Sequence, residues 1–383
     1  MTHAKSGGRG LRQLRAALLA GTALSLGMVA YGGQASAADD CGGVPAGGVV
    51  NCGPGTYNDG IAVVSPDDFE LNIGGHEDQT TIYNGPAPFF GPPNHGVTAI
   101  GLGDNDITVN VGTNTVIDST KNPNGEDGIA VLSVNGGNIV VNSSADITAA
   151  RYGISGYNMG DGDVTITNNH KITSNGAGLI GWSDGGKVSI SNNGSINSGG
   201  SGIAITDALN IPAPTGGEAE AINSGTIEAD RFGIFIRSVG NATAENTATG
   251  EITSEWNGID VVSFDGTAKV TNQGTLQSDN GYGIRVRAAG NVTVTNSGSV
   301  VAEDGGIDAL SQEGDVIVNG TGGTITANDG RGIYARSNDG KVSVTTGQVT
   351  AIDGSGVIAR AKLDAEVTVD GDIAADGWYG VKA

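Results

Sequence analysis

The sequence predicts an all-β chain that winds into a right-handed parallel β-helix, with about 24–25 residues in each of about 12–13 coils. Three observations predict this fold: a Gly-aliphatic pair that recurs at nearly constant intervals, short segments of alternating apolar residues, and 67 Gly among 383 residues. Aromatic residues make up only 4% of the chain, which argues against a layered domain with a core of large side chains. A disordered chain would lack the recurring β-branched segments.

The Gly-aliphatic pair marks the beginning of each coil. Its glycines are Gly128, Gly153, Gly178, Gly202, Gly233, Gly258, Gly283, Gly306, Gly332, Gly356 and Gly380. Looser copies precede them at Gly60 and Gly96. Residues 85–93 and 210–216 have the composition of loops, and they predict insertions between the repeated elements.

Each coil contains three segments in which apolar and polar residues alternate, and this pattern predicts three short strands with one buried face. The first begins at the repeat Gly, as in Gly258-Ile259-Asp260-Val261, and the third carries an apolar residue such as Ile227. The second ends in an Asn in six coils: Asn168, Asn192, Asn223, Asn246, Asn272 and Asn296. Strands this short cannot close a sandwich, but they can stack about 4.8 Å apart. The repeated Asn predicts an inward ladder in which each amide hydrogen-bonds the next.

The first 37 residues predict a signal peptide. A basic start is followed by an apolar stretch over residues 16–30 and by the small residues Ala35-Ser36-Ala37. The apolar stretch is too short to span a bilayer, so we expect an exported mature chain that does not cross a membrane. Residues 38–95 are expected to form an N-terminal cap with the first irregular coils. Residues 96–383 are expected to form the β-helix repeats, truncated at the C-terminus.

The two cysteines and the charge of the chain restrict its chemistry and its partners. Cys41 and Cys52 are the only cysteines, and in an oxidising compartment we expect them to form one disulfide. With 41 acidic and 19 basic residues, the formal net charge is −22. A polyanion of this kind is repelled by nucleic acids and by anionic lipids, so neither is expected as a partner.

The coils resemble those of autotransporter passenger domains, the exported part of a type V secretion system of Gram-negative bacteria. The resemblance covers the signal peptide, the Cys41–Cys52 segment and coils such as Asn223-Ser224-Gly225-Thr226-Ile227. It implies that the chain is carried to the outer membrane by a translocator β-barrel, which is missing here, and is displayed on the cell surface or secreted. It also implies adhesion to a glycan or to a host or matrix surface.

Two alternatives to this interpretation remain open. Asn122-Pro123-Asn124-Gly125 resembles a short motif of two-partner-secreted exoproteins, although a turn in an insertion explains it equally simply. The chain can also be an inactive gene fragment that has lost its barrel.

The arginines predict a candidate binding strip on one sheet. Every Arg after the signal peptide lies within two residues before or four after a repeat Gly. If the first and third residues after that Gly point inward, the second and fourth point outward. The strip that we expect to bind an anionic or sugar ligand consists of Arg237, Arg285, Arg287, Tyr334, Arg336 and Arg360. The competing explanation is a charge ladder in which Asp260, Arg285 and Asp308 pair across neighbouring strands.

An enzyme that acts on polysaccharides, similar to pectin lyases and hydrolases, is the alternative function. Asp260 and Asp308 would supply the carboxylates, two coils and about 9–10 Å apart. Arg285 between them is expected to keep both ionised, which leaves no general acid. No catalytic residue and no cofactor is therefore predicted. The Asp-rich turns at 101–106 and 160–163 match no calcium motif, and the scattered His residues predict no metal site.

Overall fold

The computed structural model describes residues 36–38, 41, 48–75, 77–84, 95–121, 125–206 and 215–383. Within these ranges the regular structure consists of strands in three long sheets, A, B and C, and no helix is present that is long and apolar enough to cross a membrane. The predicted signal peptide lies outside the described residues up to residue 35, as do residues 122–124 and the predicted insertions over residues 85–93 and 210–214.

Sheet A contains 14 strands, which form the first strand of each coil. They are β1 (Ser36–Ala38), β4 (Ile61–Ser65), β7 (Val97–Gly101), β10 (Ile129–Ser133), β13 (Ile154–Asn158), β16 (Leu179–Ser183), β19 (Ile203–Ile205), β22 (Ile234–Ser238), β25 (Ile259–Ser263), β28 (Tyr282–Ala288), β31 (Gly305–Ser311), β34 (Arg331–Ser337), β37 (Val357–Arg360) and β40 (Val381–Lys382).

Sheet B contains 13 strands, which form the second strand of each coil. They are β2 (Val49–Cys52), β5 (Phe69–Ile73), β8 (Ile107–Val111), β11 (Ile139–Ser143), β14 (Val164–Asn168), β17 (Val188–Asn192), β20 (Ala219–Asn223), β23 (Ala242–Asn246), β26 (Ala268–Asn272), β29 (Val292–Asn296), β32 (Val316–Asn319), β35 (Val342–Thr346) and β38 (Ala365–Val369).

Sheet C also contains 13 strands, which complete the coils. They are β3 (Gly55–Tyr57), β6 (Thr80–Tyr83), β9 (Thr115–Asp118), β12 (Asp146–Ala149), β15 (Lys171–Ser174), β18 (Ser195–Ser198), β21 (Thr226–Ala229), β24 (Glu251–Ser254), β27 (Thr275–Ser278), β30 (Ser299–Ala302), β33 (Thr324–Ala327), β36 (Gln348–Ala351) and β39 (Ile373–Ala375).

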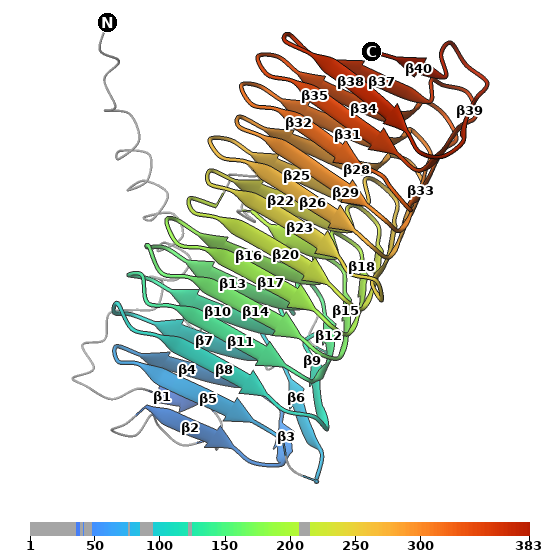
Figure 1. Ribbon diagram of the computed structural model, residues 1–383. Coiled ribbons are helices and arrows are strands. Elements are labelled where there is room, and N and C mark those ends of the chain that lie inside the picture. The colour runs from blue at the N-terminus through green and yellow to red at the C-terminus, as the bar shows by residue number, and fades with distance from the viewer. Residues whose placement is uncertain are drawn as a thin grey trace, which may run out of the picture.

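Each strand pairs with the strand three positions later in the chain, so the coils stack into the elongated parallel β-helix of Figure 1. The predicted fold class, three strands per coil and the coil number are confirmed. Pairing is parallel throughout, apart from β1, which lies antiparallel to β4 at the N-terminal end. Regular pairing begins with the first coil, where Val50 of β2 faces Leu71 of β5.

The core is a narrow column of aliphatic side chains that stack on their own kind. In sheet A, Ile234, Ile259 and Ile284 are register partners on consecutive coils, and all three are fully buried. Because each inward position repeats from coil to coil, small and β-branched residues can fill the column without large aromatic side chains. This arrangement explains how a chain with so few aromatics forms a core.

The predicted inward Asn ladder is confirmed. Nδ2 of each Asn donates to Oδ1 of the Asn on the next coil, at distances of 2.8–2.9 Å, from Asn168 to Asn296. All six side chains are fully buried. The ladder ends after Asn296, because the next coil has Gly320 at the following position. It therefore satisfies buried polar groups along half of the molecule.

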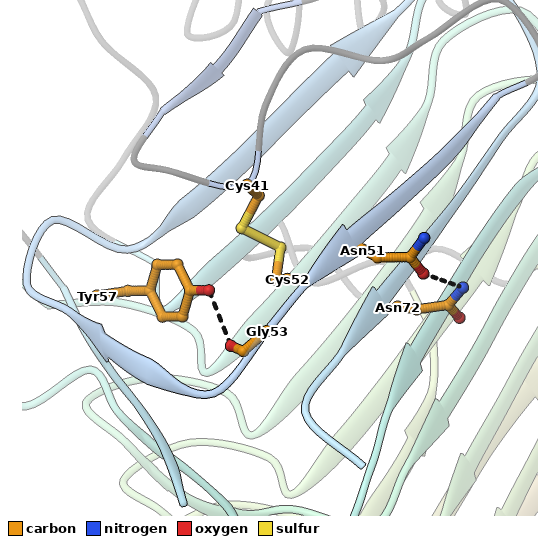
Figure 2. Close-up of a disulfide and its surroundings, with 6 residues drawn as sticks. All are labelled: Cys41, Asn51, Cys52, Gly53, Tyr57 and Asn72. Carbon is orange, nitrogen blue, oxygen red and sulfur yellow. Dashed lines mark hydrogen bonds between the residues drawn. A yellow bond between two sulfur atoms is a disulfide. The ribbon is translucent and has the colours of Figure 1, made fainter. Parts of the chain in front are cut away.

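The first coil contains the disulfide between Cys41 and Cys52, drawn in Figure 2. Tyr57 Oη donates to the Gly53 carbonyl oxygen at 2.9 Å in the turn that follows β2. On the outer face of sheet B, Asn72 donates to Asn51 at 3.2 Å, Asn110 to Asn72 at 3.0 Å and Asn142 to Asn110 at 3.0 Å. This outer ladder has no counterpart among our predictions from the sequence.

Candidate functional site

The register of sheet A places the predicted strip residues in two parallel rows on its outer face. We name the first the Arg237 row: it runs through Arg237, Val262, Arg287, Leu310, Arg336 and Arg360. We name the second the Asp260 row: it runs through Phe235, Asp260, Arg285, Asp308, Tyr334 and Ile358. Sheet A therefore brings all six predicted strip residues together.

The two rows differ in exposure, and this corrects the expectation that both face the solvent. In the Asp260 row, Asp260 is only 2% exposed and Asp308 only 8%. In the Arg237 row, Arg287 is 38% exposed at its side chain, and Arg336 and Arg360 are exposed. A ligand that approaches sheet A therefore meets the Arg237 row first.

The Asp260 row is covered by the turns that precede the strands of sheet A. Phe232 stacks on Phe235 with ring centroids 4.7 Å apart. Asn257 donates through Nδ2 to Oδ2 of Asp260 at 2.7 Å. Both turn residues come one position before the repeat Gly and fold back over the second residue after it.

Two arginines of the strip form ion pairs with the buried carboxylates. Arg285 Nη1 lies 3.7 Å from Asp260 Oδ2, and Arg287 Nη2 lies 3.3 Å from Asp308 Oδ2. Burial raises the pKa of Asp308, and the charge of Arg287 opposes that shift. Arg285 also favours the charged form of Asp308, as expected from its place between the two carboxylates, but Arg287 supplies a second cation that the sequence analysis did not assign to Asp308.

The remaining arginines of this face have no acidic partner. Among the described residues, no ion pair or side-chain hydrogen bond involves Arg237, Arg331, Arg336 or Arg360. Three of them contact aromatic rings: Arg237 lies 4.8 Å from the Phe235 ring centroid, and Arg331 and Arg360 lie 4.4 Å and 5.9 Å from that of Tyr334. A charge ladder therefore accounts for Arg285 and Arg287, whereas the other guanidinium groups keep free donors.

A charged cluster that was not predicted from the sequence lies nearer the N-terminus. Like Asn257, its residues His95 and Asp127 each directly precede a repeat Gly. Asp127, 1% exposed, accepts from Arg151 Nε at 2.7 Å, from Arg151 Nη2 at 3.1 Å and from Ser155 Oγ at 2.6 Å. Arg151 Nη2 also lies 3.0 Å from Glu126 Oε2. His95 Nδ1 accepts the Asp127 N–H at 3.0 Å. Aligning the residues that precede Gly96 and Gly128 places His95 and Asp127 on adjacent coils.

The carboxylates of this cluster and His95 come close enough to hold a metal ion, but their hydrogen bonds do not fit one. Because Nδ1 of His95 accepts a hydrogen bond, the proton of the neutral ring resides on Nε2, which then has no lone pair for a metal. Arg151 already supplies positive charge to both carboxylates. Burial lowers the pKa of His95, which favours this neutral form. The cluster is better described as a buried ion-pair network.

The Asp-rich turns have a structural use. Oδ1 of Asp106 accepts the N–H of Asn138 at 2.8 Å, and Oδ1 of Asp163 accepts the N–H of Lys187 at 2.8 Å, one coil further along. These carboxylates therefore join successive turns, and Asn138 does the same between them, because its Oδ1 accepts the N–H of Asp163.

His170 pairs with Asp146 at 2.8 Å beside a cleft of about 320 Å³ near the N-terminal end of sheet C.

Two observations bear on the alternative carbohydrate-active site. Asp260, Asp308 and Arg285 do lie on one face, and the pKa of Asp308 is raised. The carboxylates are nearly covered, however, and the clefts lined by His170 and by Asp230 lie on sheet C instead. Comparisons of the chain with models of protein families, with curated protein sequences and with solved structures find no match, so a function has to be inferred from the residues described above.

Proposed function

We propose that this chain is an exported β-helical passenger, surface-displayed or secreted, that acts as an adhesive stalk and has no enzymatic activity. The parallel β-helix is compatible with such a stalk, because stacked coils make a stiff rod that presents one long face. The resemblance of the coils to autotransporter passengers and the predicted signal peptide support export. A translocator barrel in the outer membrane is the partner that this route requires.

The observation that carries the adhesive part of the proposal is the set of arginines without acidic partners. The chain has a net charge of −22, with 41 acidic and 19 basic residues. Because carboxylates are so abundant, an arginine on its surface would be expected to form an ion pair with one of them. Arg237, Arg336 and Arg360 instead lie unpaired in one row. Free donors aligned in this way support recognition of a ligand that supplies the missing acceptors.

The export step is tested with a reporter enzyme that is active only outside the cytoplasm. Residues 1–37 fused to alkaline phosphatase are expected to give activity in the periplasm of a Gram-negative host. The same fusion with Arg9, Arg12 and Arg15 changed to Glu is the control, because reversing the basic start abolishes targeting. Equal activity from both fusions contradicts export by this segment.

The adhesive step is tested by binding the labelled chain to cultured epithelial cells and to immobilised extracellular matrix. We expect saturable binding that the Arg336→Gln/Arg360→Gln variant reduces severalfold. A chain that binds neither surface contradicts the adhesive function.

A second candidate, a carbohydrate-active enzyme, is favoured by the raised pKa of Asp308, which lies two coils from Asp260 on the same face. The test is release of reducing ends or of unsaturated products from polygalacturonate. If such release occurs and Asp308→Asn abolishes it, the enzyme replaces the stalk as the function.

A further inference from the structure

We infer that the Arg237 row binds a linear anionic polysaccharide that lies along the axis of the β-helix. This inference deepens the proposed adhesive function and rests on it, because it names the ligand class of the same face. Three arguments support it: the unpaired guanidinium groups of Arg237, Arg336 and Arg360, the spacing of the cations along the rod, and the apolar and aromatic side chains beside them.

The spacing of the cations is the first argument. Arg237, Arg287 and Arg336 occupy every second coil of their row, and Val262 and Leu310 occupy the coils between them. With neighbouring strands about 4.8 Å apart, the three guanidinium groups repeat at about 10 Å. A disaccharide of an extended polysaccharide has about this length. A polymer with at least one acidic group per disaccharide can therefore place successive charges on successive arginines, of which Arg287 also contacts Asp308.

The residues between and beside the cations suit sugar rings. Val262 and Leu310 are half-buried aliphatic side chains that offer apolar contact between two charges. Tyr334, half-buried in the adjacent row, has Arg331 and Arg360 over its ring. The ring therefore holds two guanidinium groups beside the row, and their free N–H groups can bind carboxylate or sulfate oxygens in bidentate fashion.

Acidic turns flank the row on both sides and restrict what can bind. The turns before the strands of sheet A carry the exposed residues Asp279, Asp304, Asp329 and Asp353. The turns after them carry the exposed residues Asp265, Glu313, Asp339 and Asp364. A narrow single polymer fits on the basic row between these turns, whereas a DNA duplex is wide enough to meet the acidic turns.

The test measures binding of end-labelled heparin oligosaccharides by fluorescence anisotropy. We expect the affinity to rise from the disaccharide to the hexasaccharide, as each added unit reaches another arginine. Arg336→Gln/Arg360→Gln is expected to weaken binding of the octasaccharide at least roughly tenfold. It is also expected to reduce the slope of log affinity against log salt by about 1 for each arginine removed. Both arginines are exposed and unpaired, so the fold should tolerate glutamine.

The matched control is Lys171→Gln/Lys269→Gln, which removes the same charge from exposed positions on sheets C and B. This variant should bind like the parent chain. The inference is overturned if the strip variant binds like the parent, if a neutral chito-oligosaccharide binds as tightly, or if an oligodeoxythymidylate of equal charge does.

The outcome separates this inference from the adhesive function. Cell binding that survives in the strip variant and that heparin does not compete overturns the polysaccharide and leaves adhesion standing. Oligosaccharide binding without any cell or matrix binding supports the ligand class and overturns adhesion.

Discussion

Gly258 and Leu276 share one site in the core: a β-carbon on Gly258 would lie 2.3 Å from Cδ2 of Leu276. The repeat Gly is therefore required by close packing against the apolar residue of the third strand in the same coil. The same contact recurs between Gly153 and Ile172 and between Gly233 and Ile252. The repeat Gly and the apolar residue of the third strand, which are the two most regular features of the sequence, therefore pack against each other.

Gly258→Ala is expected to destabilise the chain by about 1–3 kcal/mol, because the added methyl group overpacks the core against Leu276. Urea unfolding followed by circular dichroism measures the change. Gly53→Ala is the control, since no atom lies within 4 Å of a β-carbon at that position. Equal stability of the two variants contradicts the packing explanation.

Asn246→Ala is expected to lower the free energy of unfolding by about 3 kcal/mol, because it leaves Asn223 Nδ2 and Asn272 Oδ1 without their ladder partner in the core. Asn142→Ala, which breaks the outer ladder at an exposed side chain, should cost only a few tenths of a kcal/mol because water replaces the amide. Similar losses for both variants would mean that the inner ladder contributes nothing beyond an exposed one.

The pH dependence of stability should include a contribution from His95. Burial lowers the pKa of His95 in the folded chain below its unfolded value of 6.5. Between these two values the unfolded chain binds more protons, so the free energy of unfolding falls as the pH drops below 6.5 toward the folded pKa. His95→Asn, which keeps an acceptor for the Asp127 N–H, should flatten this acid loss in urea unfolding between pH 7 and pH 5. An unchanged pH profile would contradict it.

Asp308→Asn is expected to strengthen binding of heparin oligosaccharides severalfold, because it releases Arg287 from its ion pair and adds a free guanidinium to the Arg237 row. Weaker oligosaccharide binding would show that Arg287 needs Asp308 to hold its position.

The raised pKa of Asp308 makes its contribution to the free energy of unfolding fall as the pH rises, which is opposite to the contribution of His95. The Asp308 carboxyl stabilises the fold least at pH values above its folded pKa. Asp308→Asn should therefore gain most in relative stability near neutral pH.

Reduction of the disulfide should loosen the first coil alone. The loop between Cys41 and Cys52 contributes about 3 kcal/mol when closed. Because each coil contacts only its neighbours, we expect faster amide hydrogen exchange in β2 and β3 after reduction and unchanged exchange beyond the third coil. The Cys41→Ser/Cys52→Ser chain should exchange like the reduced parent and should not respond to reductant, since no other cysteine exists.

The sequence predicts those features that repeat from coil to coil. Alternation and spacing identify the three strands, the Asn ladder from Asn168 to Asn296 and the alignment of Arg237 with Arg287, because register is the same for every coil. They do not predict that Asp260 is buried, since this depends on how the Asn257 turn folds back over the strand. They also do not predict the contact between His95 and Asp127. An insertion separates the two residues in the sequence, although each directly precedes a repeat Gly.

Between Arg237 and Arg336, Arg and aliphatic residues alternate in the Arg237 row, so the effect of deleting coils there depends on whether their number is odd or even. Deletion of residues 258–282 removes one whole coil and keeps the β-helix intact, yet it brings Arg237 and Arg287 onto adjacent strands with like charges side by side. Removal of two whole coils, residues 258–305, places Leu310 beside Arg237 and restores the alternation. Length variants that keep the alternation between Arg237 and Arg336 should therefore differ by even numbers of coils.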